Sequence, residues 1–242
     1  MFEQHRQLNF PPWEKQLERV GATVVIAQFG QAESLQGTNG LAKFTAAFAR
    51  LMGQFTNNGR RLLVLAPTPI EQGTLSPAEA KARDRDLHRY SGAMYRWAQP
   101  LRIEFVDLSQ SLAVAGAAGQ TFTRDGLHLS PAGHWKSATV ITQAIFAGGH
   151  GWSFETAPAV LPKFTSAQER LRQLIVEKNR LWFDYWRPQN WAFLNGDRTE
   201  QASSRDHRDP KKRWFPEEME KFLPLIEAKE KEIWEAATKL QR

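Results

Sequence analysis

Short apolar runs alternate with longer amphipathic segments over the first 150 residues of the chain. Three runs of aliphatic and β-branched residues lack the polar alternation of half-exposed strands, which is typical of parallel strands covered on both faces. They lie at residues 23–29, 61–66 and 103–108. Between and after them, amphipathic and cap-like patterns predict helices over residues 41–55, 77–97 and 131–147.

This order of strand and helix predicts right-handed parallel crossovers, and therefore an α/β domain. In such sheets, ligands bind outside the carboxyl ends of the strands. Three loops are expected to leave those ends, at residues 30–40, 67–76 and 109 onward. A fourth loop, residues 121–130, enters the last helix.

The alternation stops beyond Gly151, so the sequence predicts an α/β domain over residues 1–150 and a helical, aromatic-rich extension over residues 151–242. Helices are expected at residues 166–186 and 215–240. The second carries an apolar stripe formed by Phe222, Ile226, Ile233, Ala237 and Leu240. That stripe packs on the domain or, alternatively, binds a protein partner through the Phe222–Leu240 helix.

Composition narrows the class of protein. Hydrophobic residues make up 41% and charged residues 24% of the 242 positions, which is globular composition. The absence of cysteine excludes disulfide scaffolds, Cys-ligated zinc, iron–sulfur clusters and thiol catalysis. No apolar run reaches the ~20 residues of a membrane span. The printed N-terminus shows no signal peptide, so the compartment stays open, and export is compatible with a longer natural N-terminus.

The net charge of +6 raises the question of nucleic-acid binding. The sharpest basic cluster, residues 205–213, is diluted by Asp206 and Asp209. A solvated loop is therefore the preferred interpretation of this cluster over a nucleic-acid interface.

The tetrapeptide Asp125-Gly126-Leu127-His128 carries the clearest chemistry. A histidine that acts as a base needs a carboxylate on its other ring nitrogen, which fixes the tautomer and stabilises the imidazolium. An aspartate three residues before a histidine, on a turn that contains glycine, supplies that pair from one loop. The alternative is an ordinary surface turn.

With these elements, the sequence resembles the SGNH (GDSL-type) hydrolase superfamily, whose last motif reads Asp-x-x-His and opens the final helix. The third motif of that family follows a buried strand, as Gly30-Gln31-Ala32-Glu33 does here. Bacterial GDSL-like relatives also carry a segment that reads as residues 186–190 do, Trp-Arg-Pro-Gln-Asn. The resemblance implies a three-layer α/β/α sandwich of flavodoxin-like type with a parallel sheet, here N-terminally incomplete, plus a helical extension.

The same resemblance implies ester hydrolysis by a Ser-His-Asp triad, without a cofactor. His128 would be the general base and Asp125 its orienting partner. The loop formed by Gly30, Gln31, Ala32 and Glu33 would be the oxyanion and substrate loop. The implied substrate is a small-molecule or carbohydrate ester, such as an acetylated carbohydrate.

Two departures from the family pattern matter. Ala32 stands where the family has an oxyanion-hole Asn, and the loss of one such donor typically costs ~10²–10³ in rate. Gln31 is a possible substitute donor, although a shift of one residue usually turns a side chain elsewhere. Glu33 is expected to bond the backbone of its own loop.

The second departure concerns the nucleophile, because nothing before residue 23 reads as a strand followed by Gly-Asp-Ser. Residues 1–20 read as a loop and a helix. Ser34 is a conceivable but poor nucleophile, and Ser130 is better explained as a helix cap. The sequence therefore suggests that Met1 is an internal methionine and that the nucleophile lies upstream. The alternative is an inactive remnant.

The remaining histidine candidates are better explained by ordinary structural roles than by function. A metal site formed by Asp125, His128 and His134 is disfavoured, because the six-residue step does not place both histidines on one helical face. His88 is expected on a solvated helix face. Three functions stay open. The first is an ester hydrolase that is inactive in the sequence as printed. The second is a non-catalytic ligand-binding module of the same fold, and the third is an interaction protein.

Overall fold

The computed structural model describes residues 12–116, 120–146, 163–194 and 196–240. The chain forms two compact units. The first comprises residues 16–162, and the second comprises residues 163–242 together with residues 1–15. The predicted domain boundary at residue 150 lies outside the described residues. Helix α2 (Trp13–Arg19) precedes the first strand.

A parallel three-stranded sheet forms the centre of the first unit. Its strands are β1 (Val24–Gln28), β2 (Arg61–Leu65) and β3 (Glu104–Val106), in the spatial order β1-β2-β3. The register pairs Val24 with Arg61 and Leu65 with Val106. All three carboxyl ends therefore meet at one edge, as the alternation of the sequence predicts.

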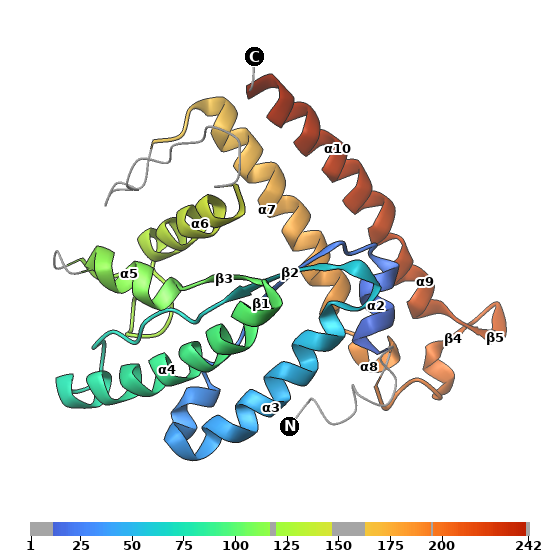
Figure 1. Cartoon of the computed structure of the whole chain (residues 1–242). Coiled ribbons are helices and arrows are strands. Elements are labelled where there is room, and N and C mark those ends of the chain that lie inside the picture. The colour runs from blue at the N-terminus through green and yellow to red at the C-terminus, as the bar shows by residue number, and fades with distance from the viewer. Residues whose placement is uncertain (1–11, 117–119, 147–162, 195, 241–242) are drawn as a thin grey trace. The chain divides into compact units, whose positions relative to one another are not determined.

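Helices cover the two faces of this sheet (Figure 1). Helices α3 (Gly37–Phe55) and α4 (Pro77–Ala98) pack on one face, against Ala27, Leu62 and Val64. Side chains of α5 (Leu108–Gly116) and α6 (Pro131–Phe146) pack with Leu63 and Leu65, which point to the opposite face. The predicted α/β sandwich with a parallel sheet is confirmed.

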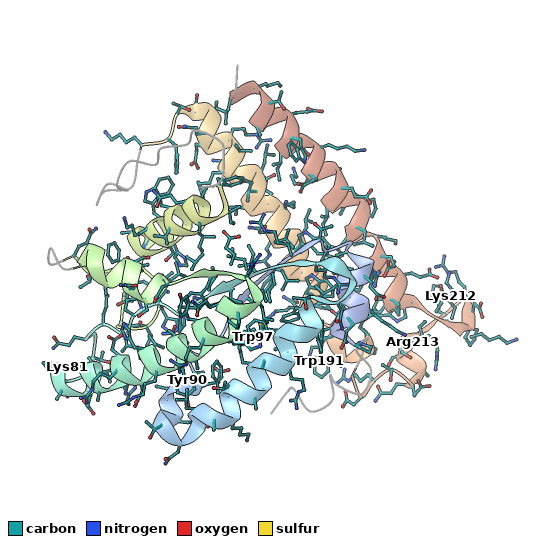
Figure 2. All side chains as sticks on the ribbon, viewed as in Figure 1. Lys81, Tyr90, Trp97, Trp191, Lys212 and Arg213 are labelled. Atoms are coloured by element: carbon teal, nitrogen blue, oxygen red, sulfur yellow. The ribbon has the colours of Figure 1, made fainter. Side chains whose placement is uncertain are left out.

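Aromatic packing joins α3 to α4. The Tyr90 ring centroid lies 4.9 Å from that of Phe44, and the Trp97 centroid lies 5.4 Å from that of Phe48. Tyr90 also donates a hydrogen bond to the Gly37 carbonyl at 2.9 Å. Figure 2 shows Tyr90 and Trp97 on α4. This layer holds the start of α3, and hence the loop before it, against the sheet.

Strand β1 differs from the prediction that it is covered on both faces. In the described part of the chain, β1 pairs with β2 alone and forms an edge of the sheet. Val24 is 49% exposed and Ile26 is 53% exposed. They point to the same face as Leu63, but the core cluster on that face contains neither of them. The β-branched run was read correctly as a strand and wrongly as a buried one.

Three predicted element boundaries are also corrected. The third strand ends at Val106, and Leu108 already begins α5. Helix α3 begins at Gly37, four residues before the apolar pattern starts. The helix predicted over residues 215–240 is two helices, α9 (Trp214–Glu220) and α10 (Phe222–Leu240).

The second unit is largely helical. Helix α7 (Ser166–Trp186) packs against α10, with ion pairs from Lys178 to Glu230 and from Lys229 to Glu177. Ile226, a member of the predicted stripe, is buried. Helix α8 (Trp191–Leu194) and the hairpin β4 (Arg205–Asp206) to β5 (Asp209–Arg213) complete this unit. Short 3₁₀ turns occupy Glu33–Gln36, Asn57–Gly59, Gln99–Leu101 and Ala202–Ser204.

Candidate active site

The predicted Asp125–His128 pair forms within a single turn. Asp125 Oδ2 lies 2.7 Å from His128 Nδ1. The other carboxylate oxygen accepts hydrogen bonds from the backbone amides of His128 at 2.8 Å and Leu127 at 3.1 Å. Gly126 makes the turn possible because its φ of +93° lies in the left-handed region that side chains disfavour.

These hydrogen bonds set the charge state of the pair. The backbone amide of His128, then its imidazole and the Leu127 amide, hold the pKa of the Asp125 carboxyl well below its usual range. Asp125 is therefore an anion at neutral pH. A carboxylate on Nδ1 favours the tautomer that carries the proton there and leaves Nε2 as the free ring nitrogen. The His128 side chain is 70% exposed, so Nε2 is accessible from solvent.

A short antiparallel frame holds the ends of this turn. The Arg124 amide donates to the His128 carbonyl at 2.8 Å, and the Ser130 amide donates to the Phe122 carbonyl at 2.8 Å. Ser130 Oγ accepts a hydrogen bond from the Gly133 amide at 3.1 Å. The predicted capping role of Ser130 is thus confirmed, and its hydroxyl is engaged at the start of α6.

The loop that follows β1 contains the predicted oxyanion residues. Gly30 has a φ of +98°, and its amide donates to Glu33 Oε2 at 3.0 Å. Glu33 therefore bonds its own loop, as expected. Ala32 precedes the first 3₁₀ turn and offers no side-chain donor. The Gln31 Nε2 atom is buried and has no hydrogen-bond partner in the described part of the chain.

The loop after β2 links the two predicted site loops, residues 30–33 and the Asp125–His128 turn. Thr68, in the loop after β2, lies with its Oγ1 3.5 Å from Gln31 Oε1. Glu71, in the same loop, accepts hydrogen bonds from residues 122–123 beside the Asp125–His128 turn. Among the described residues, no hydrogen bond joins residues 30–33 directly to Asp125 or His128. Sequence analysis missed Glu71, because no local signal links it to a turn some fifty positions away.

No hydroxyl group of the described residues hydrogen-bonds to His128 Nε2. Ser34, the conceivable nucleophile in the sequence, is buried and donates to the Gln31 carbonyl at 2.8 Å. The described residues therefore supply a carboxylate–imidazole pair but no hydroxyl group positioned beside it.

Side chains of a serine, a histidine and an aspartate also approach one another between α4 and α5. His88 Nε2 lies 3.4 Å from Ser109 Oγ, while His88 Nδ1 hydrogen-bonds the Asp84 backbone carbonyl at 2.8 Å and lies 3.4 Å from Asp84 Oδ2. Asp84 and His88 are four residues apart on α4, so their proximity could be read from the sequence, whereas nothing in the sequence indicated Ser109. Because Ser109 is 0% exposed, its hydroxyl cannot meet a substrate in this structure.

A cavity of about 250 Å³ opens beside the loop after β1. Apolar side chains of this loop and of α3, three of them phenylalanines, make up much of its lining, together with one anion and one cation. The lining residues are Phe29, Glu33, Gln36, Gly40, Lys43, Phe44, Ala47, Phe48 and Leu51.

The described residues contain neither a metal-ligating cluster nor a membrane-spanning helix. Within residues 12–116, 120–146, 163–194 and 196–240, no three His, Asp or Glu side chains cluster so as to hold a metal ion. No helix in these ranges has the length and apolar character needed to cross a bilayer.

Solved structures with similar folds include several esterases. An acetyl xylan esterase is 16% identical at a TM-score of 0.48, over 55% of this chain and 72% of its own. A catalytic mutant of an acetylxylan esterase from Geobacillus stearothermophilus is 18% identical at 0.45, over 62% and 67%. A gut microbial diltiazem-metabolizing enzyme is 17% identical at 0.40, over 54% and 35%. Identities this low do not by themselves indicate a shared activity.

The comparison with curated proteins found no match. A family model does match, over residues 4–136, which is more than half of the chain. The matched range includes the sheet, the loop after β1 and the Asp125–His128 turn. On this match, the chain belongs to the GDSL-like lipase/acylhydrolase family.

Proposed function

We propose that this protein hydrolyses esters with His128 as general base and Asp125 as its orienting partner. One observation carries the proposal: Asp125 Oδ2 lies 2.7 Å from His128 Nδ1, while Nε2 is free and accessible. In acyl transfer, Nε2 takes the proton of an attacking hydroxyl and later returns it to the leaving group. Asp125, held ionised, stabilises the imidazolium formed between these steps.

The loop after β1 is the proposed oxyanion and substrate loop, and it sets the expected rate. Ala32 offers no donor, and the Gly30 amide already bonds Glu33. Among residues 30–33, Gln31 Nε2 is the remaining side-chain amide. Because one missing donor typically costs ~10²–10³ in rate, we expect turnover well below that of a complete oxyanion hole.

The first experiment measures aryl acetate hydrolysis by the gene product purified from its native cells, because no nucleophile is assigned among the described residues. His128→Ala is expected to lower kcat by at least about 10³-fold. The matched control is His88→Ala, which removes the histidine beside Ser109 and is expected to leave turnover unchanged. Unchanged turnover in His128→Ala would contradict the proposal, and loss in His88→Ala alone would move the activity to the other histidine.

The proposed substrate class is an acetylated carbohydrate. The test compares an acetylated xylo-oligosaccharide with an aryl acetate and an aryl octanoate at equal concentration. A kcat/KM that is highest for the oligosaccharide supports the proposal. A preference for the octanoate would contradict it and would indicate a lipase-like acyl site.

A non-catalytic ligand-binding module of the same fold is the second candidate function. The cavity beside the loop after β1 favours it, since three phenylalanine rings and the Lys43 ammonium suit an aromatic carboxylate. The test adds phenylbutyrate as the probe and detects its binding by the NMR chemical shifts of the α3 backbone amides. Saturable shifts that Lys43→Gln weakens, in a protein without ester turnover, would favour this function over hydrolysis.

A further inference from the structure

The loop after β2 contacts the Asp125–His128 turn through the Glu71 carboxylate. Its two oxygens accept the Phe122 amide at 2.9 Å and the Thr123 amide at 2.9 Å, and one of them also accepts the Thr123 hydroxyl. Three donors from two consecutive residues thus converge on a single side chain. Because hydrogen bonds to an ionised acceptor are roughly twice as strong as neutral ones, this is a firm anchor.

The anchor continues into the turn itself. Thr123 Oγ1, while donating to Glu71, accepts the Gly126 amide at 3.1 Å. The Glu71 amide donates to the Gly126 carbonyl at 3.0 Å. Gly126 lies between Asp125 and His128, so the Glu71 backbone holds its carbonyl while the Glu71 side chain, through Thr123, holds its amide.

Two glycines permit this close approach. A Cβ atom on Gly126 would lie 2.7 Å from the Glu71 carbonyl oxygen, and a Cβ atom on Gly73 would collide with the Asp125 backbone. The two backbones therefore pack directly on one another, with no side chain between them. A loop held in this way fixes the orientation of the peptides on which Asp125 and His128 are mounted.

We infer that Glu71, acting through the Thr123 hydroxyl, is a positioning residue that holds Asp125 in contact with His128 Nδ1. The catalytic meaning of this role rests on the proposed function of His128, whereas the geometry and its test do not. Without the anchor, the turn would still be joined to α6 through Ser130 and to the Glu71 backbone amide, but the Gly126 amide would lose the oriented Thr123 hydroxyl as its acceptor. The imidazole would then sample orientations away from Asp125.

The test is NMR of the whole chain, with ¹⁵N shifts of the His128 ring reporting which nitrogen carries the proton. In the wild type, neutral His128 is expected to carry it mainly on Nδ1. In Glu71→Gln and Thr123→Val, the Nδ1-protonated fraction is expected to fall by about half or more, because an unbound imidazole favours Nε2. The pKa of the Asp125 carboxyl should rise toward its usual range in both variants.

Two controls match these variants. Thr123→Ser keeps the hydroxyl and is expected to retain the wild-type tautomer. Glu79→Gln removes a carboxylate from the first turn of α4, the helix that follows the loop of Glu71, and this carboxylate bonds Ser76 instead of the turn. In a form that hydrolyses aryl acetate, Glu71→Gln should lower kcat about tenfold with KM unchanged.

A wild-type tautomer in both Glu71→Gln and Thr123→Val would overturn the inference. So would loss of the cooperative unfolding transition in Glu71→Gln, because the carboxylate would then support the whole sheet rather than this turn. Absence of ester turnover in the wild type would contradict the proposed function alone, since the tautomer measurement needs no substrate.

Discussion

At the residue scale, Asp125 links the electrostatics of the turn to the stability of the protein. Hydrogen bonds from the His128 amide, the His128 ring and the Leu127 amide favour its ionised form. The folded-state pKa of this carboxyl therefore lies below its unfolded-state value, near 3.9. Its contribution to stability is fully present above about pH 4 and is lost as the pH falls through the folded-state pKa.

This sign predicts how Asp125→Asn behaves. The variant should have a lower free energy of unfolding than the wild type at about pH 7, and the difference should narrow as the pH falls below about 4. Urea unfolding across that range measures it. Asp197→Asn, at an exposed aspartate of the second unit, should show no such convergence. A difference that stays constant down to about pH 3 would mean that charge is not what Asp125 contributes.

Sequence analysis could predict the Asp125–His128 pair because both partners lie in one turn, where spacing and glycine define the geometry. The same local logic identified the Ser130 cap and the bond from Glu33 to its own loop. Glu71 and Ser109 escaped it, because their partners come from other loops and helices. Sequence spacing does not encode such contacts until the sheet brings the elements together.

At the scale of elements, α6 packs so closely on the residues that flank the Asp125–His128 turn that one glycine is required. A Cβ atom on Gly133 would collide with the Phe122 carbonyl oxygen and lie 2.9 Å from a Leu129 methyl group. Gly133→Ala should therefore lower the free energy of unfolding by ~1–3 kcal/mol. Denaturant unfolding measures the change.

Gly53 is the matched control for Gly133, since it also lies in a helix, α3, but a Cβ atom added to it would meet nothing within 4 Å. Gly53→Ala should raise stability by ~0.5–1 kcal/mol, because alanine loses less backbone entropy on folding. Equal effects of the two substitutions would contradict the close packing of α6.

Helix α4 begins with a capping box that the sequence analysis did not identify. Ser76 Oγ accepts the Glu79 amide, and Glu79 accepts the Ser76 amide at 3.1 Å. Ser76→Ala should cost ~1 kcal/mol and should raise hydrogen-exchange rates in the first turn of α4. Thr74→Ala, two residues earlier at an exposed position, should change neither. Unaltered exchange in Ser76→Ala would show that the cap is redundant with tertiary packing.

The misplaced boundaries also have local causes. Asp107 Oδ1 accepts the Gln110 amide at 2.9 Å, and the Asp107 carbonyl accepts the Ser111 amide. Asp107 thus starts a helix within an apolar run that reads as strand. Pro224 lacks the amide that would bond the Glu220 carbonyl, so one predicted helix becomes α9 and α10. In both cases, one polar or imino residue overrides the apolar periodicity.

At the scale of the whole molecule, the sequence predicts the layers well and the sheet edge poorly. Alternation of strand and helix is enough to define a parallel sheet between helices. Burial of β1 depends on what lies beside it, and its β-branched composition is the same for an edge strand and a central one. The exposure of Val24 and Ile26 could therefore be found only from the structure.

An apolar edge strand predicts self-association. In the described part of the chain, no strand pairs with the outer edge of β1, so its amide and carbonyl groups offer a template for another chain, beside the exposed Ile26 side chain. The weight-average mass measured by light scattering should therefore rise with protein concentration. Ile26→Lys should suppress this rise, because an edge lysine resists strand pairing.

Ile26→Lys should change the free energy of unfolding by only about 0.5 kcal/mol, since the Ile26 side chain is half exposed. Leu35→Lys is the matched control, because Leu35 is 57% exposed but lies in a 3₁₀ turn outside the sheet. It adds the same charge and should leave association unchanged. If both variants suppressed association equally, net charge and not the β1 edge would be the cause. If neither did, another surface would drive the association. A constant wild-type mass would contradict the prediction that the β1 edge pairs with another chain.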